Sequence, residues 1–289
     1  MLVYIWNLTH GGFPRDPNEL RIQVTGIDRF VEEKGAKTLV LGWSEDEQVF
    51  AAFDVTKHRR SMRGRSPSLQ VRIEALKAAK KNGFAPHHRT GISEVAIAFR
   101  PDFISTYVEE LEALHLSGKH PSELNTLERI AAADPVEKIV DIPAGPRKTV
   151  LQKVQRKVRD ARFRTNVLAV YDHRCAVSGI QLDLLDAAHI IPVEHEKGTD
   201  ELINGICLTP LHHRAFDRAL IGIRNDYSIV LNKGKLQELE AIGWDGGVEV
   251  FKATLRDQIN LPAKREHYPN LEYLLLGQSM RGWSKSDLA

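Results

Sequence analysis

Long hydrophobic runs are missing from this sequence of 289 residues. No stretch of about 18 consecutive apolar residues occurs, so we expect no membrane-spanning helix. The first residues, MLVYIWNLTHGG, have neither a basic start nor a long apolar core, which argues against a signal peptide. Only two cysteines, Cys175 and Cys207, are present, too few for a disulfide framework. Together these absences predict a protein of the reducing cytoplasm.

The composition predicts two folded domains of mixed secondary structure. Hydrophobic residues make up 42% of the chain and charged residues 27%, as in ordinary globular proteins. A chain of this length suits two domains rather than one. We expect an α+β fold: a mixed α/β domain at 1–115, a linker with one helix at 116–147, and a second domain at 148–289.

Alternating and helical patterns place the elements of the first domain. Apolar residues alternate in two runs that flank the turn-rich GGFPRDPN, as in a hairpin, and two further runs flank the turn SEDE. The predicted strands are 2–8, 20–27, 37–43, 48–55 and 93–101, and the predicted helices are 28–37, 67–81 and 102–115. In the second domain a basic helix is expected at 148–171, a strand at 227–232, and helices at 236–242 and 267–280.

The strongest chemical signal lies in the second domain. It consists of DAAHIIP at 186–192, Asn204, and HHRAFD at 212–217. Phosphodiester hydrolysis needs an activated water and neutralisation of charge on the phosphate. A histidine can accept the proton of that water, and a divalent ion held by carboxylate and imidazole groups can neutralise the charge. An asparagine between them can orient the base or hold the intervening loop.

The order and spacing of these residues resemble the HNH (ββα-metal) endonuclease family, in the branch common among bacterial restriction enzymes. The resemblance covers about 164–223 and includes FRTNVLAVYDHRCAVSG before the motif. It implies that His189 is the general base and Asn204 the family asparagine, so both are candidate catalytic residues. It also implies that His213 and Asp217 are metal ligands. Their spacing of four places both on one face of a helix, and the ion is expected to be Mg²⁺ or Mn²⁺.

Two departures from the family pattern change the expected ligand set. The residue before the base is Ala188, where the family usually has His or Asp. Asp186 can supply the missing carboxylate, because positions 186 and 188 share one face of a strand; the alternative is an acid that only solvates the strand entry. Structural zinc is not expected, because the two CxxC pairs of many relatives read Cys175/Ser178 and Thr209/His212 here.

Other polar residues near the motif have less specific interpretations. His195 is expected on the surface, and His212 is expected to pack or to contact phosphate, since it points about 100° away from His213. Glu194 and Asp200 are interpreted as loop charges. Without zinc, the core is expected to rest on apolar packing by Ile180, Leu182, Ile190, Ile191, Ile206, Leu208, Leu211 and Phe216.

Basic residues cluster although the net charge is only +2. No acid occurs between 57 and 72, and Asp160 is the only acid between 147 and 164. Such runs are usually solvated faces, but beside a nuclease motif they favour contact with phosphates. The candidate DNA-binding residues are Arg59, Arg60, Arg63, Arg65 and Arg214. His58 and the segment 87–89 could belong to a recognition surface or to an exposed loop.

We therefore predict a restriction-type endonuclease that cleaves double-stranded DNA. The first domain would recognise the site, and a homodimer would cut both strands, because one HNH site cuts one strand. Two alternatives within the nucleases stay open: an enzyme that requires modified DNA, and an indiscriminate defence nuclease switched on by an effector. A further alternative is a DNA-binding protein whose nuclease site has decayed, which Ala188 keeps open.

Overall fold

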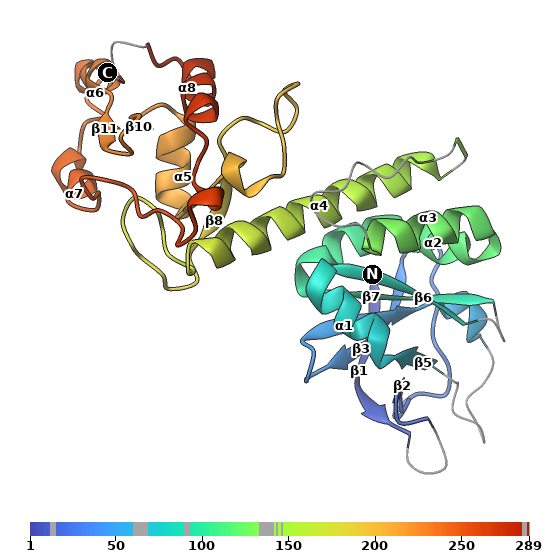
Figure 1. Cartoon of the computed structure of the whole chain (residues 1–289). Helices are drawn as coiled ribbons and strands as arrows, with labels where there is room; N and C mark the ends of the chain where they lie inside the picture. Colours follow the sequence, from blue (N-terminus) through green and yellow to red (C-terminus); the bar gives the residue numbers. More distant parts are fainter. Residues whose placement is uncertain are drawn as a thin grey trace. The chain divides into compact units, whose positions relative to one another are not determined.

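The computed structural model describes residues 1–11, 16–59, 69–89, 93–132, 142, 144–145, 147–284 and 288. The chain divides into two compact units, residues 1–161 and 162–289 (Figure 1). Both helices and strands occur in each unit, which confirms the predicted α+β class. Of the helices in these described ranges, none is both long enough and apolar enough to cross a membrane.

A seven-stranded sheet forms the centre of the first unit, with the strand order β5-β2-β1-β3-β4-β7-β6. The parallel pair is β1 with β3, and every other pairing in this sheet is antiparallel. The predicted hairpin of β1 with β2 is confirmed, and β3 and β4, predicted as two strands around a turn, also pair. The strands are β1 Leu2–His10, β2 Glu19–Ile22, β3 Thr38–Ser44, β4 Val49–Phe53, β5 Leu69–Arg72, β6 Phe84–Arg89 and β7 Glu94–Phe99.

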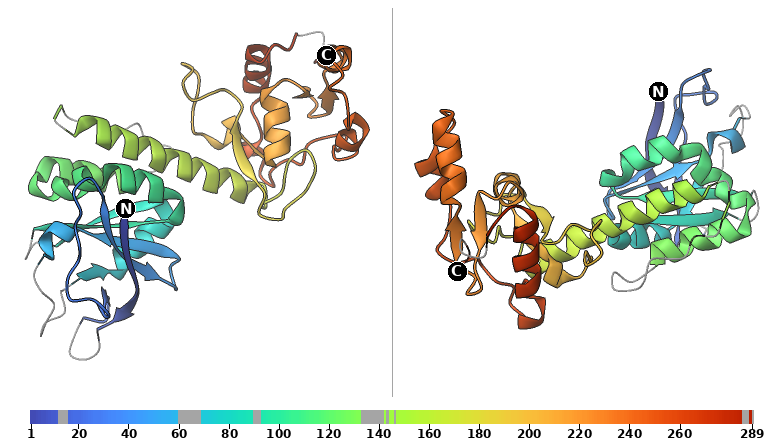
Figure 2. Two further views of the ribbon diagram at one scale, coloured as in Figure 1. Left: turned by 180° about the vertical axis from the view of Figure 1, so that it is seen from behind. Right: turned by 90° about the horizontal axis from the view of Figure 1, so that it is seen from above.

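Helices cover both faces of this sheet. The helix α1 packs against β4, β5, β6 and β7, whereas α2 packs on β7 and α3 on β6. Figure 2 shows the helices from behind and from above. Gly83 ends α1 at φ +88°, and a side chain there would collide with Phe103. The helices are α1 Ile73–Asn82, α2 Ile104–Leu116, α3 Pro121–Ala132 and α4 Lys148–Val170.

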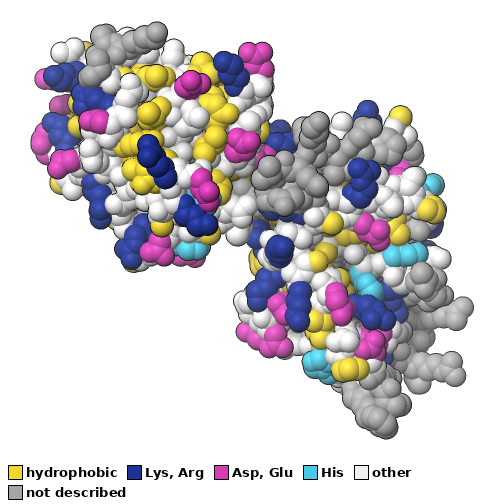
Figure 3. Space-filling model, in the orientation of Figure 1, with side chains coloured by type: hydrophobic (Ala, Val, Ile, Leu, Met, Phe, Trp, Pro, Cys, Tyr) yellow, Lys and Arg dark blue, Asp and Glu magenta, His cyan; other side chains and the backbone are white. Residues whose placement is uncertain are grey.

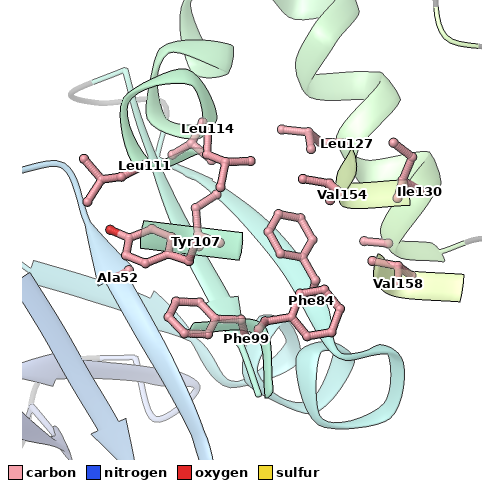
Figure 4. Packing of buried hydrophobic residues seen from close by; sticks show 14 of the residues in the cluster. Ala52, Phe84, Phe99, Tyr107, Leu111, Leu114, Leu127, Ile130, Val154 and Val158 are labelled. Carbon is pink, nitrogen blue, oxygen red and sulfur yellow. The ribbon is translucent and has the colours of Figure 1, made fainter. Parts of the chain in front are cut away.

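The segment predicted as a linker contributes to the core of the first unit. Leu127 and Ile130 of α3, with Val154 and Val158 of α4, pack against Phe84 and Phe99 of the sheet; Figure 4 shows these side chains converging. The division between the units consequently falls within α4, after Ala161, rather than at the predicted boundaries of 115 and 148. An apolar face on each helix accounts for this difference, because such a face requires a partner surface.

The predicted helix at 28–37 is wrong. This segment is irregular, and Gly35 has φ +81°. Its main apolar residue, Phe30, is buried against the rings of Tyr4 and Trp6, with ring centroids 5.3 and 6.2 Å away. The apolar positions of the segment do not repeat at helical spacing, so a helix would bury too little surface to form.

The second unit contains two small two-stranded sheets, β8 with β9 and β10 with β11. Its core includes Phe163, Val167, Ile206 and Phe216. Three residues expected in that core are instead exposed: Ile180, Leu182 and Leu211. The elements are β8 Asp186–His189, β9 Gly205–Leu208, α5 Pro210–Asp217, β10 Ile221–Ile223, β11 Ile229–Leu231, α6 Lys233–Ala241, α7 Val248–Lys252 and α8 Leu271–Met280.

Short 3-10 helices complete the described elements. They lie at Val55–Lys57, Pro101–Phe103, Ser117–Lys119, Leu202–Asn204 and Arg265–His267. The fourth of these comes directly before β9 and therefore fixes where the second strand of the β8–β9 pair begins.

Candidate active site

The strands β8 and β9 and the helix α5 form one ββα unit that carries the predicted site (Figure 1). The strands pair antiparallel, with Asp186 opposite Leu208 and His189 opposite Gly205. Thr209 caps α5 by accepting a hydrogen bond from the backbone N–H of His212, and Pro210 occupies the first turn. Because α5 follows β9 at once and packs on both strands, strand and helix side chains meet in a small space.

Two contacts hold the imidazole of His189. Its ring stacks on Phe163, with centroids 3.7 Å apart and planes within 7°. Its Nε2 lies 3.1 Å from Oδ1 of Asp200. The His189 side chain is 22% exposed and that of Asp200 is 8% exposed. The ring is therefore fixed on one side and open to solvent on the other, as a general base requires.

Gly205 makes room for the ring beneath His189. A Cβ atom at this position would lie 2.4 Å from Val167 and 3.1 Å from Phe163. Since real Cβ atoms do not approach so closely, any larger residue would displace the aromatic ring on which His189 stacks. The glycine opposite the proposed base is thus required by packing.

Asn204 is fully buried and binds the loop rather than the base. Its Oδ1 accepts a hydrogen bond from the backbone N–H of Ile191, and its Nδ2 donates to the carbonyl oxygens of Ile191 and Thr199. Of the two roles that the sequence left open, orienting the base or holding the loop, these bonds correspond to the second. A buried amide with three such bonds holds the end of β8 to the start of the returning chain.

The sequence interpretation missed the contact of Asp200 with His189. The prediction places Asp200 among the loop charges, but the chain from Pro192 to Gly198 turns back tightly and returns Asp200 to His189. His195 and Gly198 donate backbone hydrogen bonds within this turn, and a Cβ at Gly198 would lie 2.2 Å from the carbonyl oxygen of Pro192. Gly198 was the available signal for the return, whereas no regular spacing connects positions 189 and 200.

The three predicted metal ligands lie side by side. Nδ1 of His213 is 3.7 Å from Oδ2 of Asp186, and Nε2 of His213 is 3.4 Å from Oδ2 of Asp217. The two carboxylates therefore flank opposite nitrogens of one imidazole. Each also pairs with an arginine: Arg164 donates to Asp186 and Arg281 to Asp217, both at 3.0 Å.

The chemistry of this donor set fits a divalent ion, but the three groups do not converge on one point. Across the described part of the chain, no group of three or more His, Cys, Asp or Glu side chains has the arrangement of a metal site. A metal ion accepts one nitrogen from an imidazole, so His213 can share an ion with Asp186 or with Asp217 as the side chains stand. Either pair has carboxylate and imidazole donors suited to Mg²⁺ or Mn²⁺.

Arg281, just after α8, holds the site together from a distant part of the sequence. It donates to Asp217, to the backbone carbonyl oxygens of His189 and Ile190, and to that of Gly277. Its guanidinium also lies 4.6 Å from the ring centroid of Phe216. The motif gave no indication of this residue, because it follows the last motif position by more than 60 residues.

The positions that correspond to zinc ligands in relatives hold a hydrogen-bonded cluster. His212 is buried, which confirms its packing role, and its ring bonds to Thr209, Thr254 and the Cys175 thiol. Burial raises the pKa of Cys175, but hydrogen bonds from His212 and Ser178 outweigh burial and lower it to about 7. Burial and the neighbouring Cys175 raise the pKa of Cys207 to about 12. Both cysteines are buried and free.

The structure describes two of the five predicted DNA contacts. Arg59 is exposed and forms a two-fold hydrogen-bonded ion pair with Glu32, and Arg214 is exposed on α5. Arg60, Arg63 and Arg65 lie outside the described residues. On the face seen in Figure 3, lysine and arginine side chains are interspersed with acids over both units.

The histidines considered for recognition in the first unit belong partly to its interior. His58 and Arg89 both bind the buried carboxylate of Glu94, at 2.9 and 2.7 Å, and Arg89 also donates to Gln70. Burial, followed by the nearby Arg72, lowers the pKa of His87. Buried ion pairs of this kind hold strands together, so this cluster is not an exposed reading surface.

Comparison with known proteins gives two family matches. Residues 175–224 match a family described as HNH endonuclease, and residues 1–108 match one described as Methylase-associated X1. No curated protein shows a significant match. Among solved structures, the chain is similar to one titled "Modification dependent TagI restriction endonuclease", at 15% identity and a TM-score of 0.36, over 98% of this chain and 82% of that one. A TM-score this low supports no conclusion about fold or function.

Proposed function

We propose that this chain is a restriction-type DNA endonuclease with His189 as its general base, because residues 175–224 match the HNH endonuclease family. The observation that carries the proposal is that one ββα unit holds both His189 and the Asp186–His213 pair. The unit thus carries a partly exposed candidate base together with a carboxylate and a second imidazole.

In the proposed hydrolysis, His189, Phe163 and Arg214 each have a distinct role. The proton of the attacking water passes to His189, the water oxygen bonds to phosphorus, and the bond from phosphorus to the leaving oxygen breaks. The leaving oxygen keeps the electron pair of that bond and takes a proton from solvent. Phe163 holds the plane of the His189 ring. Arg214, exposed on the same helix as His213, binds a neighbouring backbone phosphate, because a guanidinium matches phosphate oxygens in charge and geometry.

HNH nucleases use divalent metal ions, and we assign the ligands here to Asp186, His213 and Asp217. A bound ion neutralises charge on the phosphate and on the leaving oxygen. Asp186 with His213 is the better-supported pair. Arg281 places two donors on Asp217 and is itself 10% exposed, whereas Arg164 places one donor on Asp186 and is 44% exposed. Asp186 is therefore the carboxylate more easily released to an ion.

Incubation with plasmid DNA tests the nuclease proposal. We expect Mg²⁺ or Mn²⁺ to support cleavage of double-stranded plasmid and EDTA to abolish it. Nicked circles as the main product would indicate that single copies act, whereas linear product whose rate rises with the square of protein concentration would support the proposed homodimer. Failure to cut any plasmid with either ion would contradict the proposal.

Calorimetry with Mn²⁺ alone tests the ligand assignment. We expect Asp186→Ala and His213→Ala each to weaken Mn²⁺ binding about 10- to 100-fold, and Asp217→Ala to weaken it less. Asp183→Ala is the matched control, because Asp183 is an exposed acid that precedes β8 in the same unit. Equal affinities for wild type, Asp186→Ala and His213→Ala would show that the ion binds elsewhere.

A second candidate is a nuclease that requires modified DNA. It is favoured by the family that residues 1–108 match, whose description associates it with methylases. Plasmids prepared with and without cytosine or adenine methylation separate the two functions. Cleavage of unmethylated plasmid alone supports the restriction type, whereas cleavage of methylated plasmid alone selects the second candidate. Equal cleavage of both would contradict a role for methylation in either direction.

A further inference from the structure

The segment that returns from β8 to β9 brings a further acid, whose side chain is almost fully buried, to the proposed active site. Asp200 places Oδ1 3.1 Å from Nε2 of His189, and its side chain is 8% exposed. A carboxylate accepts hydrogen bonds and cannot donate them when ionised, so Nε2 of His189 must carry the proton in this contact. The other ring nitrogen, Nδ1, then has its lone pair free to accept a proton.

We infer that Asp200 is a positioning residue that fixes His189 with Nε2–H engaged and Nδ1 directed to the attacking water. This inference rests on the proposed function. Stacking on Phe163 at 3.7 Å sets the plane of the ring but leaves it free to turn within that plane. The contact with Asp200 removes this remaining freedom. The carboxylate also stabilises the imidazolium that forms when His189 takes the proton.

The family asparagine acts on the base through this acid. Nδ2 of Asn204 donates to the carbonyl oxygen of Thr199 at 2.8 Å, and Thr199 directly precedes Asp200. The same amide binds both backbone groups of Ile191, two residues after the base. Asn204 therefore ties the segment that carries Asp200 to the strand that carries His189, and it sets the distance between them without touching the imidazole.

Kinetics on plasmid DNA with Asp200→Ala and Asp200→Asn test the inference. We expect Asp200→Ala to lower kcat about 10- to 100-fold, a part of what a general base contributes, with KM for DNA unchanged. Asp200→Asn keeps an oxygen that can accept from Nε2–H, so it should recover part of the loss. The matched control is Glu201→Gln, which removes the neighbouring exposed acid and should keep the wild-type kcat.

Proton NMR supplies a readout that a merely structural role would not change. The wild-type protein should show a protected Nε2–H signal of His189, identified by its absence in His189→Gln. Asp200→Ala should lose this signal while keeping the folded spectrum and melting temperature, and Glu201→Gln should retain it. A wild-type kcat in Asp200→Ala, or an Nε2–H signal that persists in it, would overturn the inference.

The hypothesis that His189 is the base and the hypothesis that Asp200 positions it can be refuted independently. If His189→Ala cleaves DNA as well as the wild type, the assignment of the base is wrong. If His189→Ala is inactive but Asp200→Ala retains the wild-type kcat, the base assignment stands and only the positioning role is lost.

Discussion

Each unit contains a histidine within hydrogen-bonding distance of a carboxylate, but the surroundings of the two pairs differ. In the first unit, His58 lies 2.9 Å from Glu94, with side-chain exposures of 6% and 0%. The carboxylate of Glu94 also accepts from Arg89 and from the backbone N–H of Asp54. In the second unit, His189 lies 3.1 Å from Asp200, with exposures of 22% and 8%.

The difference distinguishes a structural pair from the pair that we propose to be catalytic. The carboxylate of Glu94 is shielded from solvent and has all its hydrogen bonds within the protein. It accepts them from Arg89 on β6, from the backbone of Asp54 and from His58. The His189 pair is closed on one side only, by Phe163 and Asp200. A buried, satisfied carboxylate contributes to folding, whereas a partly exposed histidine beside a carboxylate can exchange a proton with water.

The largest expected effect is a loss of catalysis when His189 is replaced. His189→Ala should lower kcat on plasmid DNA about 10²- to 10⁴-fold, because general base catalysis contributes a factor of this size. Its melting temperature should stay close to that of the wild type. The matched control is His195→Ala, a loop histidine whose Nδ1 accepts from the backbone N–H of Lys197. Comparable losses in both variants would erase the distinction between the pairs.

Removing the Glu94 carboxylate should instead lower the free energy of unfolding. Glu94→Ala removes the buried carboxylate that pairs with Arg89 and His58, and breaking a buried ion pair typically costs about 3–5 kcal/mol of the free energy of unfolding. Urea denaturation measures the loss, and kcat per folded molecule should be unchanged. Glu32→Ala breaks the exposed pair with Arg59 and should have no measurable effect. A Glu94→Ala protein as stable as Glu32→Ala would contradict the structural role.

Gly205→Ala should lower both stability and kcat, because it displaces the Phe163 ring on which His189 stacks. A Cβ at this position overlaps Val167 and Phe163, and overpacking of a core typically costs about 1–3 kcal/mol. The displaced Phe163 ring should also lower kcat. Gly234→Ala in α6 is the control, since its Cβ meets only ordinary contacts. A wild-type kcat in Gly205→Ala would show that stacking on Phe163 is dispensable.

The smallest expected effect is a dependence of stability on pH in the first unit. Burial lowers the pKa of His115, which donates to the carbonyl oxygen of Val95 and accepts from Tyr107. The unfolded chain binds a proton there below about pH 6.5 and the folded chain does not, so stability should be full above that pH and decline below it. Urea midpoints at pH 7.5 and 5.5 measure the decline, and His115→Gln should flatten it.

The sequence predicted which motif residues lie on one ββα unit better than it predicted the surrounding fold. The motif residues lie together because β8, β9 and α5 are consecutive and short, so spacing in the sequence translates into position in space. The pairing of β1 with β3 and the packing of α3 on β6 depend on contacts between distant segments, which local patterns do not reveal. The helix expected at 28–37 failed for the same reason, since burial of Phe30 between two strand residues outweighed local propensity.

Within the site, the sequence interpretation missed the residues that irregular segments of the chain bring to His189. Asp200 returns by a tight loop, and Arg281 arrives from the end of α8, so neither has a fixed spacing to His189. Exposed Leu182 illustrates the opposite error, because an apolar residue was assigned to the core from its type alone. Its φ of 50° belongs to an irregular turn in which the side chain projects outward, at 78% exposure.

The bonds from Arg281 also determine when the site forms during synthesis. Arg281 donates to the backbone carbonyl of His189 across 92 residues of sequence and to Asp217 across 64. At a translation rate of about 5–20 residues per second, Asp217, the last motif residue, precedes Arg281 by roughly 3–13 seconds. During that interval the nascent chain contains the whole motif but lacks the side chain that joins strand to helix. The motif is therefore synthesised several seconds before the site can be assembled.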